Sequence, residues 1–374
     1  MARFRLRNLW RTLHLWIGLC LFVVLAPLGL SGSLLVFDDS LDHLLHPVRY
    51  AVSSAPATPS AAAYIAAARA AFGDRALPDQ LRLPTAPGQP VTVIGAARPP
   101  GAVKPGQRPV QLTAWLDPGG GKVLDVANPR QELRGMIHQL HGNLFMAQPG
   151  RKVVGWLGVA MLISSITGLC LWWPRNNAVL KGLRWTRSPS GFSNLHHMAG
   201  FWICVPLAIL SFSGAFIAFP EVAAALRPAD AAARPERTQQ NAFAVPLAAP
   251  QLSADAAVAA ALAEAGGAAR VVQLTLPTEG DRPAWRVQLK GEGGPVQVRV
   301  DDRLGKAKLQ HGGPAQGPEG RDPLTRFMRN LHDGDDMGPV WRVIIVLAGL
   351  APTLLGATGT VIWLAGRRRP AATS

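Results

Sequence analysis

Hydrophobic residues along this chain gather in four uncharged blocks, and two long segments of mixed polarity separate them. The blocks are Leu15–Phe37, Val153–Trp173, Met198–Phe219 and Val343–Leu364, and none contains a Lys, Arg, Asp or Glu. A helix needs about 20 apolar residues to cross the hydrocarbon layer of a membrane. The pattern therefore predicts an α-helical integral membrane protein with a bundle of four membrane-spanning helices.

The two mixed segments predict small α+β modules. Residues 60–73 are alanine-rich with helical spacing, and short alternating runs follow near 80–84, 90–95, 110–116 and 122–126. After the third block, a Pro-rich linker leads to a second alanine-rich helix at 253–265 and to strand-like runs near 271–276, 284–290, 295–300 and 306–310. Each segment is therefore expected to fold as one helix on a small antiparallel sheet.

Blocks and modules recur in the same order, which indicates an internal duplication. Leu13–Phe37 and Leu195–Phe219 both begin with Leu-His, and both contain a Ser-Gly pair whose glycine lies 18 residues after the histidine. Leu140-His141 and Leu331-His332 precede the other two blocks, each 27 residues before a glycine that follows threonine. We predict two parallel repeats of span, module and span, related by an axis along the membrane normal.

This order also predicts the domain boundaries. They are 1–37 for the N-terminus and first span, 38–130 for the first module, 131–174 for a His-bearing segment and second span, 175–194 for a cytoplasmic loop, 195–219 for the third span, 220–325 for the second module, and 326–374 for a second His-bearing segment, the fourth span and the cytoplasmic tail.

The distribution of basic residues predicts the orientation of the spans. The N-terminus, the loop between the second and third spans, and the C-terminal tail hold eleven Lys and Arg and no acidic residue. Such segments stay in the cytoplasm, so both termini are expected there and the modules in the periplasm of a bacterial inner membrane. The same rule explains most of the net charge of +15, so we do not expect nucleic-acid binding. Membrane lipids are expected partners.

Missing motifs limit the redox chemistry. The three cysteines all lie inside apolar blocks, and the chain has no CxxCH motif for covalent c-type haem and no Cys-rich run for an iron–sulfur cluster. No Rossmann, flavin or Walker motif is present either. A reductant would therefore have to come from a cytoplasmic partner or a quinol.

Four of the nine histidines occupy equivalent positions in the two repeats: His14 with His196, and His141 with His332. A twofold-like axis brings equivalent positions together, so each pair could supply two axial ligands to one planar metal complex. Neutral imidazole suits iron, and two imidazoles without Cys or carboxylate partners fit a bis-histidine haem better than a tetrahedral zinc site.

Several neighbouring residues are alternatives or supporting contacts. Gly18 and Gly200 lie one turn after the first two histidines and could leave room for a porphyrin or for a close helix contact. His197 could replace His196. His138 could replace His141 or flank the haem propionates, and Arg329, at the equivalent position in the second repeat, could pair with a propionate.

A second histidine group follows the first span. His43 and His46 stand three residues apart and could face the same way on a helical turn. A metal site there and a solvated pair are both open, and solvation is the simpler interpretation.

These residues resemble the PepSY-associated transmembrane family. The resemblance rests on the two LHxxxG spans, the LHGNLF segment around His141, the TGLxLWWPR segment Thr167–Arg175 and the duplicated modules, and it covers nearly the whole chain. Within the family, the chain is most similar to inner-membrane ferrisiderophore reductases. The resemblance implies two b-type haems in the bundle, PepSY modules in the periplasm, and reduction of a ferric siderophore to release Fe(II).

Two other functions stay open at this stage. The chain could be a di-haem quinol oxidoreductase that serves another periplasmic acceptor. It could also be a haemless membrane anchor whose PepSY-like modules bind a peptide or a protease.

Overall fold

A computed structural model of the chain describes residues 2–53, 59–97, 111–146, 148–173, 188–225, 245–266, 269–280, 282–291, 294–310 and 323–367. The chain divides into two units. The first combines Met1–Asp38, Met136–Ala233 and Pro323–Ser374, and the second combines Asp39–Gly135 and Arg234–Asp322. Most of the predicted cytoplasmic loop, residues 175–187, and the basic tail beyond Arg367 lie outside the described residues.

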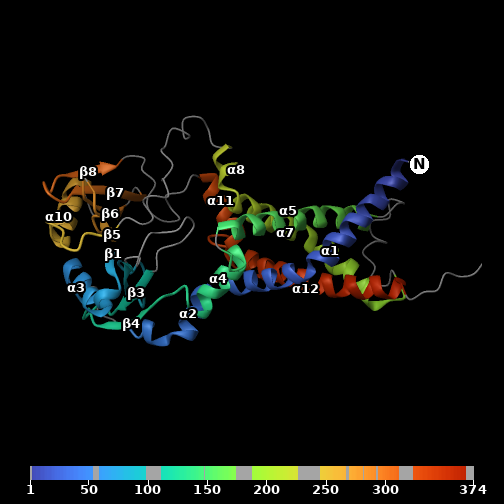
Figure 1. The fold of residues 1–374 in the computed structure, drawn as a ribbon, viewed down its shortest axis with the longest axis horizontal. Coiled ribbons are helices and arrows are strands. Elements are labelled where there is room, and N and C mark those ends of the chain that lie inside the picture. Colours follow the sequence, from blue (N-terminus) through green and yellow to red (C-terminus); the bar gives the residue numbers. More distant parts are fainter. Residues whose placement is uncertain are drawn as a thin grey trace, which may run out of the picture. The chain divides into compact units, whose positions relative to one another are not determined.

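The first unit contains the four apolar helices that the sequence predicts (Figure 1). They are α1 (Ala2–Leu35), α5 (Gln148–Trp172), α7 (Gly191–Ala218) and α12 (Gly338–Arg367). Each has the length and composition to cross a membrane. Large apolar side chains face outward, for example Val23 at 74% and Trp202 at 67% exposure, which suits contact with lipid. The chain is therefore a multi-pass integral membrane protein, as predicted.

Short helices adjoin the spans. α4 (Leu133–Asn143) precedes α5, α11 (Pro323–Asp333) precedes α12, and α8 (Pro220–Ala225) follows α7. A left-handed turn ends both α4 and α11, because Leu144 and Phe145 have φ of 53° and 58° and Gly334 has φ of 86°. The two His-bearing segments are therefore separate helices rather than extensions of the spans.

Small residues bring the spans into close contact. On α12, a Cβ added at Gly349 would lie 2.6 Å from the carbonyl oxygen of Gly29 on α1. On α5, a Cβ added at Gly158 would lie 3.1 Å from the carbonyl oxygen of Ser211 on α7. Helices in lipid associate through such backbone approaches, so these glycines hold α1 against α12 and α5 against α7.

The second unit contains an eight-stranded antiparallel sheet with the order β4-β3-β2-β1-β5-β6-β7-β8. Its strands are β1 (Leu77–Arg82), β2 (Val91–Ala96), β3 (Gln111–Leu116), β4 (Val123–Ala127), β5 (Arg270–Thr275), β6 (Ala284–Gly291), β7 (Gly294–Asp301) and β8 (Ala307–Gln310). Two helices, α3 (Ala61–Phe72) and α10 (Ala254–Ala265), pack on it. The remaining short elements are α2 (Asp38–Leu45) and the 3₁₀ turns Pro47–Tyr50 and Gly73–Arg75.

The sequence predicted two separate sheets, and the structure corrects this. Each predicted helix and strand forms within a few residues of its expected position, but β1 pairs with β5. Residues Gln80, Leu81 and Arg82 pair with Thr275, Leu274 and Gln273. An unpaired edge strand exposes backbone groups that seek a partner, and the pairing satisfies both inner edges at once.

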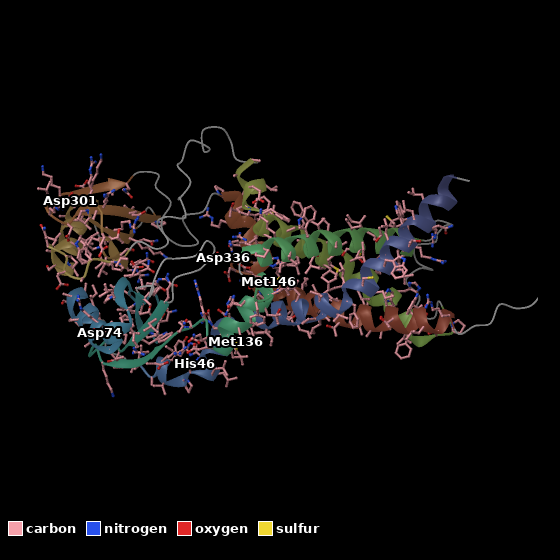
Figure 2. All side chains as sticks on the ribbon, in the orientation of Figure 1. His46, Asp74, Met136, Met146, Asp301 and Asp336 are labelled. Atoms are coloured by element: carbon pink, nitrogen blue, oxygen red, sulfur yellow. The ribbon has the colours of Figure 1, made fainter. Side chains whose placement is uncertain are left out.

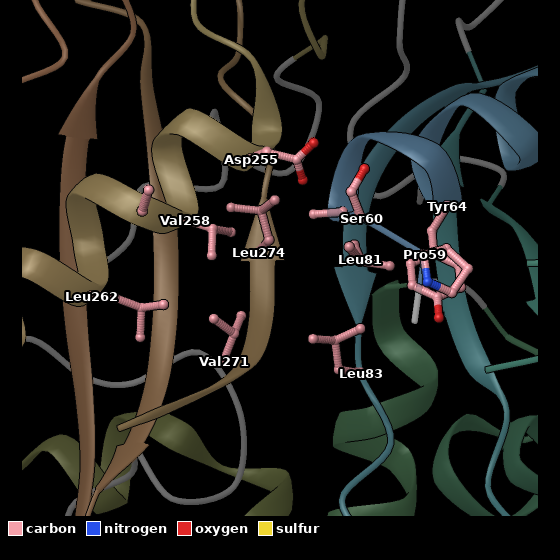
Figure 3. Close-up of a pocket in the computed structure, with 12 residues that line it drawn as sticks. Pro59, Ser60, Tyr64, Leu81, Leu83, Asp255, Val258, Leu262, Val271 and Leu274 are labelled. Atoms are coloured by element: carbon pink, nitrogen blue, oxygen red, sulfur yellow. The ribbon is translucent and has the colours of Figure 1, made fainter. Parts of the chain in front are cut away.

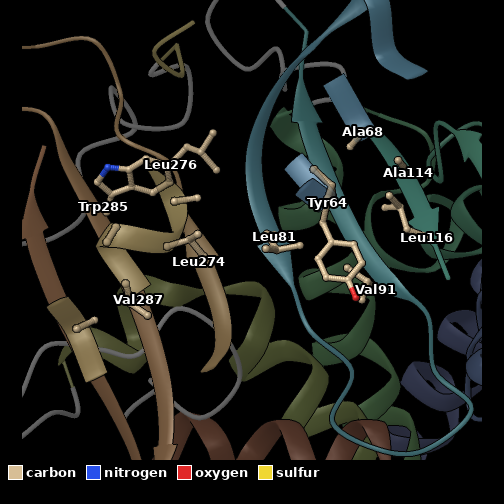
Figure 4. Packing of buried hydrophobic residues seen from close by; sticks show 14 of the residues in the cluster. Tyr64, Ala68, Leu81, Val91, Ala114, Leu116, Leu274, Leu276, Trp285 and Val287 are labelled. Atoms are coloured by element: carbon tan, nitrogen blue, oxygen red, sulfur yellow. The ribbon is translucent and has the colours of Figure 1, made fainter. Parts of the chain in front are cut away.

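Alternate strand residues form the core on the face that α3 and α10 cover (Figure 4). Leu81, Val93, Leu274, Val287 and Val298 are each at most 1% exposed. Both helices begin at a serine whose hydroxyl accepts a backbone N–H, the usual N-terminal cap. The two halves thus share one apolar layer.

A groove of about 420 Å³ runs between α3 and α10, above the β1–β5 pair (Figure 3). Its walls are mostly apolar, with Tyr64 and Leu83 on one side and Val258 and Leu262 on the other. Its polar groups are engaged, because Ser60 Oγ accepts from the N–H of Ala63, Asp255 Oδ1 accepts from the N–H of Ala62, and the Tyr64 hydroxyl donates to a backbone carbonyl. The groove is a packing gap without acid–base machinery.

The helix contacts generate a first prediction. We expect Gly349→Ala to weaken the α1–α12 contact and to destabilise the bundle by about 1–3 kcal/mol, because the new Cβ has no space. Gly366→Ala on the same helix is the matched control, since its Cβ would meet no atom within 4 Å. Unfolding in SDS, followed by tryptophan fluorescence, measures both. Equal midpoints for the two variants would contradict the assigned contact.

Candidate functional site

The four equivalent histidines lie in two facing pairs in the helical unit. The ring centres of His14 on α1 and His196 on α7 are 6.3 Å apart, and those of His141 on α4 and His332 on α11 are 6.0 Å apart. We call these the first and the second histidine pair. His141 packs against Gly32 of α1, which lies 18 residues after His14, so about 27 Å of helix separates the two pairs.

Each imidazole is anchored to a neighbouring helix through Nδ1. The contacts are His14 to Ser164 O at 3.0 Å, His141 to Leu28 O at 2.9 Å, His332 to Leu210 O at 3.0 Å, and His196 to Thr358 Oγ1 at 3.0 Å. A carbonyl oxygen can only accept, so Nδ1 carries the proton at the first three sites. Nε2 then keeps the lone pair that binds a metal.

A hydroxyl group fixes the same tautomer at His196. Thr358 Oγ1 donates its own proton to Leu354 O at 2.8 Å, so it must accept from the imidazole. Hydroxyl groups also approach the other three rings. Their distances to Nδ1 are 3.4 Å for Thr167 at His14, 3.5 Å for Ser31 at His141 and 3.2 Å for Ser213 at His332.

A glycine lies against each imidazole. A Cβ added at the glycine would approach the ring Cε1 to 3.0 Å for Gly168 and His14, 3.3 Å for Gly359 and His196, 2.7 Å for Gly32 and His141, and 2.8 Å for Gly214 and His332. A side chain would therefore displace or tilt the ring. The repeated Ser-Gly and Thr-Gly pairs in the sequence marked these positions, but without the structure they carried no assigned role.

Burial sets the charge of the second pair. Desolvation, followed by repulsion from His332, lowers the pKa of His141 to about 4. Desolvation also lowers the pKa of His332. Both rings are therefore neutral at pH 7, which is the form that ligates a metal.

These residues fit two axial ligands on one planar metal complex. A metal–imidazole bond is about 2 Å long and the ring centre lies about 1 Å behind the nitrogen, so two axial rings have centres about 6 Å apart. Both pairs meet this distance. Beside the first pair, a Cβ at Gly18 would meet no atom within 4 Å, and one at Gly200 would meet only Leu355, at 3.8 Å. The donor set and this clearance fit a b-type haem.

The other predicted site residues lie outside the facing pairs. His197 is exposed, and its ring centre is 6.2 Å from that of His196. His138 is exposed and pairs with Asp38 at 3.2 Å. Arg329 lies 3.9 Å from Asp333. The structure thus brings His196 and His141, rather than His197 and His138, to their partners.

A polar cluster that the sequence did not reveal lies in the sheet unit, around His46 (Figure 2). Asp42, His46 and Glu132 lie close enough to hold a metal ion. However, the buried guanidinium of Arg49 donates to Asp42 at 3.2 Å, to Asp125 at 2.7 Å and to both oxygens of Glu132. We interpret the cluster as a network of ion pairs with a structural role, because Arg49 already neutralises the carboxylates.

The expected solvated pair holds for His43, which is exposed, but not for His46, which belongs to the cluster. His46 Nδ1 lies 3.0 Å from Asp42, and the His43 ring stacks on Tyr50 with 3.4 Å between centres. The sequence missed this cluster because its acidic partners, Asp125 and Glu132, come from a distant part of the module.

Fold and site first define a class: a multi-pass membrane protein with two facing histidine pairs in a helical bundle. Comparison with protein families then gives a specific result. The family model described as the PepSY-associated TM region matches residues 11–365. The chain belongs to this family. No curated protein matches the chain.

Arg49 generates a second prediction. We expect Arg49→Met to destabilise the region around α2, β3 and β4 by about 3 kcal/mol or more, because three carboxylates lose a buried cation. Hydrogen exchange of the full-length protein should show faster opening there. Arg75→Met is the control, since exposed Arg75 donates to the carbonyls of Phe72 and Ala71 at the end of the preceding helix α3 and not to a carboxylate of the cluster. Similar exchange in both variants would contradict the structural role.

The same cluster predicts a dependence on pH. Burial alone would raise the pKa of Asp42, but hydrogen bonds from Tyr50 and His46 and the charges of Arg134 and Arg49 lower it below the ordinary value. Stabilisation by Asp42 is therefore complete above the unfolded-state pKa and is lost as the pH falls through the lower folded-state pKa. We expect the free energy of opening around α2, obtained from exchange rates corrected for their intrinsic pH dependence, to fall in acid. Asp42→Asn should reduce this dependence on pH. The same dependence in the variant and the wild type would contradict the role assigned to Asp42.

Proposed function

We propose that this protein is a membrane oxidoreductase that holds b-type haem at both histidine pairs and delivers electrons to a ferric chelate outside the cytoplasm. The observation that carries the proposal is the set of four Nδ1-anchored imidazoles in two pairs, 6.3 and 6.0 Å apart. When bound, haem iron would supply one-electron chemistry between Fe(III) and Fe(II).

Each residue around a pair has a defined task in this proposal. The histidines supply Nε2 to iron, and the carbonyl or hydroxyl at Nδ1 fixes the tautomer and raises the basicity of the ligand. The glycines let the rings sit against the helix without a clash. Gly18 and Gly200 leave space beside the first pair.

The separation of the pairs supports transfer across the membrane. About 27 Å of helix lies between them, close to the thickness of about 30 Å of the hydrocarbon core. The basic termini support a cytoplasmic location of the first pair in an inner membrane, under the positive-inside rule. Electrons would then enter there from a cytoplasmic donor or a quinol.

The acceptor in this proposal is a ferric siderophore. Siderophores hold Fe(III) through hard oxygen donors, and Fe(II) is a softer ion that binds such donors less tightly. Reduction by one electron would therefore release Fe(II) from the chelate. Membership of the PepSY-associated TM region family supports a role within the membrane, and the redox chemistry and the acceptor are left to experiment.

We also propose that the chain consists of two parallel repeats with a PepSY module in each. The contacts of the histidines recur at equivalent positions. Leu28, Ser31 and Gly32 around His141 correspond to Leu210, Ser213 and Gly214 around His332, and Thr167 and Gly168 correspond to Thr358 and Gly359. The same order of one helix and four strands recurs in the sheet unit.

A fourth prediction tests the ligands. We expect His14→Ala or His196→Ala to remove one haem, and His141→Ala or His332→Ala to remove the other, because a single imidazole cannot hold the iron in a six-coordinate state. Reduced-minus-oxidised spectra of purified protein measure this loss. The exposed neighbours His197 and His138 supply matched Ala controls that should keep both haems. Full haem content in all four ligand variants would end the assignment.

A fifth prediction tests the acceptor. Chemically reduced protein should be reoxidised by a ferric siderophore, with one Fe(II) trapped by a chromogenic chelator for each electron lost. The Ga(III) form of the same siderophore should cause no reoxidation, because Ga(III) has no accessible lower state. Reoxidation by a quinone but not by any ferric chelate would favour the quinol-linked alternative instead.

A further inference from the structure

The sheet face opposite α3 and α10 carries an ordered set of basic residues on β5–β8. Side chains alternate between faces along a strand, so the neighbours of core residues Val287 and Val298 belong to this opposite face. Two rows of directly paired basic residues cross it. They are Arg286–Arg299–Lys308 on β6, β7 and β8, and Arg270–Lys290 on β5 and β6.

A row of amides lies between the two basic rows. Gln273, Gln288, Gln297 and Gln310 pair with one another across β5 to β8. The first three are only 7–9% exposed, whereas Arg270, Lys290, Arg299 and Lys308 are exposed. The face therefore carries a central row of glutamine amides with a row of basic side chains on each side.

Two acidic residues that the structure describes near this face, Asp301 and Asp79, already interact with other groups. Asp301 ends β7 on the same face, and its carboxylate accepts the N–H groups of Arg303 and Leu304, both at 2.9 Å (Figure 2). Asp79 on β1 interacts electrostatically with Arg286. Like charges directly opposite one another destabilise a sheet, so two such rows indicate an anionic partner.

The dimensions limit that partner to a compact molecule. Strands lie about 4.8 Å apart, so the row from β6 to β8 is about 10 Å wide, and the two basic rows are about 13 Å apart along the strands. Among the described residues of β5–β8, none is a large exposed apolar side chain. Insertion into lipid needs such anchors.

We propose that this face binds a ferric chelate of net negative charge, such as an Fe(III) tris-catecholate. The cations attract the charge, and the glutamine amides donate hydrogen bonds to the ligand oxygens. The identity of the anion as an iron chelate rests on the proposed function. The charge preference rests on the sheet alone.

The test uses full-length protein in detergent and redox-inert Ga(III) chelates, so that binding is measured without electron transfer. We expect Arg286→Gln/Arg299→Gln/Lys308→Gln to bind Ga(III) tris-catecholate about tenfold more weakly or worse, and wild-type affinity to fall with added salt. A neutral Ga(III) trihydroxamate should show no such loss. Lys122→Gln/Arg303→Gln/Lys306→Gln removes the same charge from turns and should bind like wild type.

The outcomes separate this inference from the proposed function. Equal catecholate affinity in both triple variants, or equal losses for both chelates, would overturn the inference. Binding of short-chain phosphatidylglycerol in place of the chelate, lost in the first variant, would assign the face to lipid headgroups and also overturn it. Charge-dependent chelate binding by a protein without haem would support the surface and remove the proposed reductase. Haem spectra and unfolding midpoints confirm that the variants fold.

Discussion

Each imidazole of the two histidine pairs is held by one interaction, the hydrogen bond from its Nδ1–H to an oxygen of a neighbouring helix. The residue that supplies the acceptor oxygen and the glycine that contacts the ring lie within about one turn of the same helix. The carbonyl or hydroxyl fixes the tautomer, and the glycine permits the approach. A histidine without this anchor would be a mobile polar group at the edge of an apolar bundle.

Small residues therefore serve two purposes in the helical unit. Gly349 and Gly158 bring helices into contact with one another, while Gly32 and Gly214 bring histidines into contact with helices. The two uses are compatible because these glycines lie on different helices, α12 and α5 for the contacts between helices and α1 and α7 for the contacts with histidines. Helix packing sets the distance between the facing rings, so the geometry of each pair depends on glycines that never touch a histidine.

The sheet unit is organised by different forces. Its core is an apolar layer shared by both halves, and Arg49 ties α2 to β4 and to the segment before α4 through buried ion pairs. Because its helices cover one face, the opposite face can carry charge without disturbing the core. The basic surface on that face is the observation on which the proposed binding of an anionic chelate rests.

The sequence alone determined the four spans, the order of helices and strands, and the four equivalent histidines, since apolar length, period and repeat spacing are local properties of the chain. Only the tertiary structure decided that β1 and β5 join two modules into one sheet, that Arg49 lies among three carboxylates, and that His196 rather than His197 faces His14. Those outcomes depend on which distant segments approach one another. These contacts are set by side-chain packing, by hydrogen bonding of the backbone groups of edge strands and by pairing of buried charges. No single stretch of the sequence encodes them.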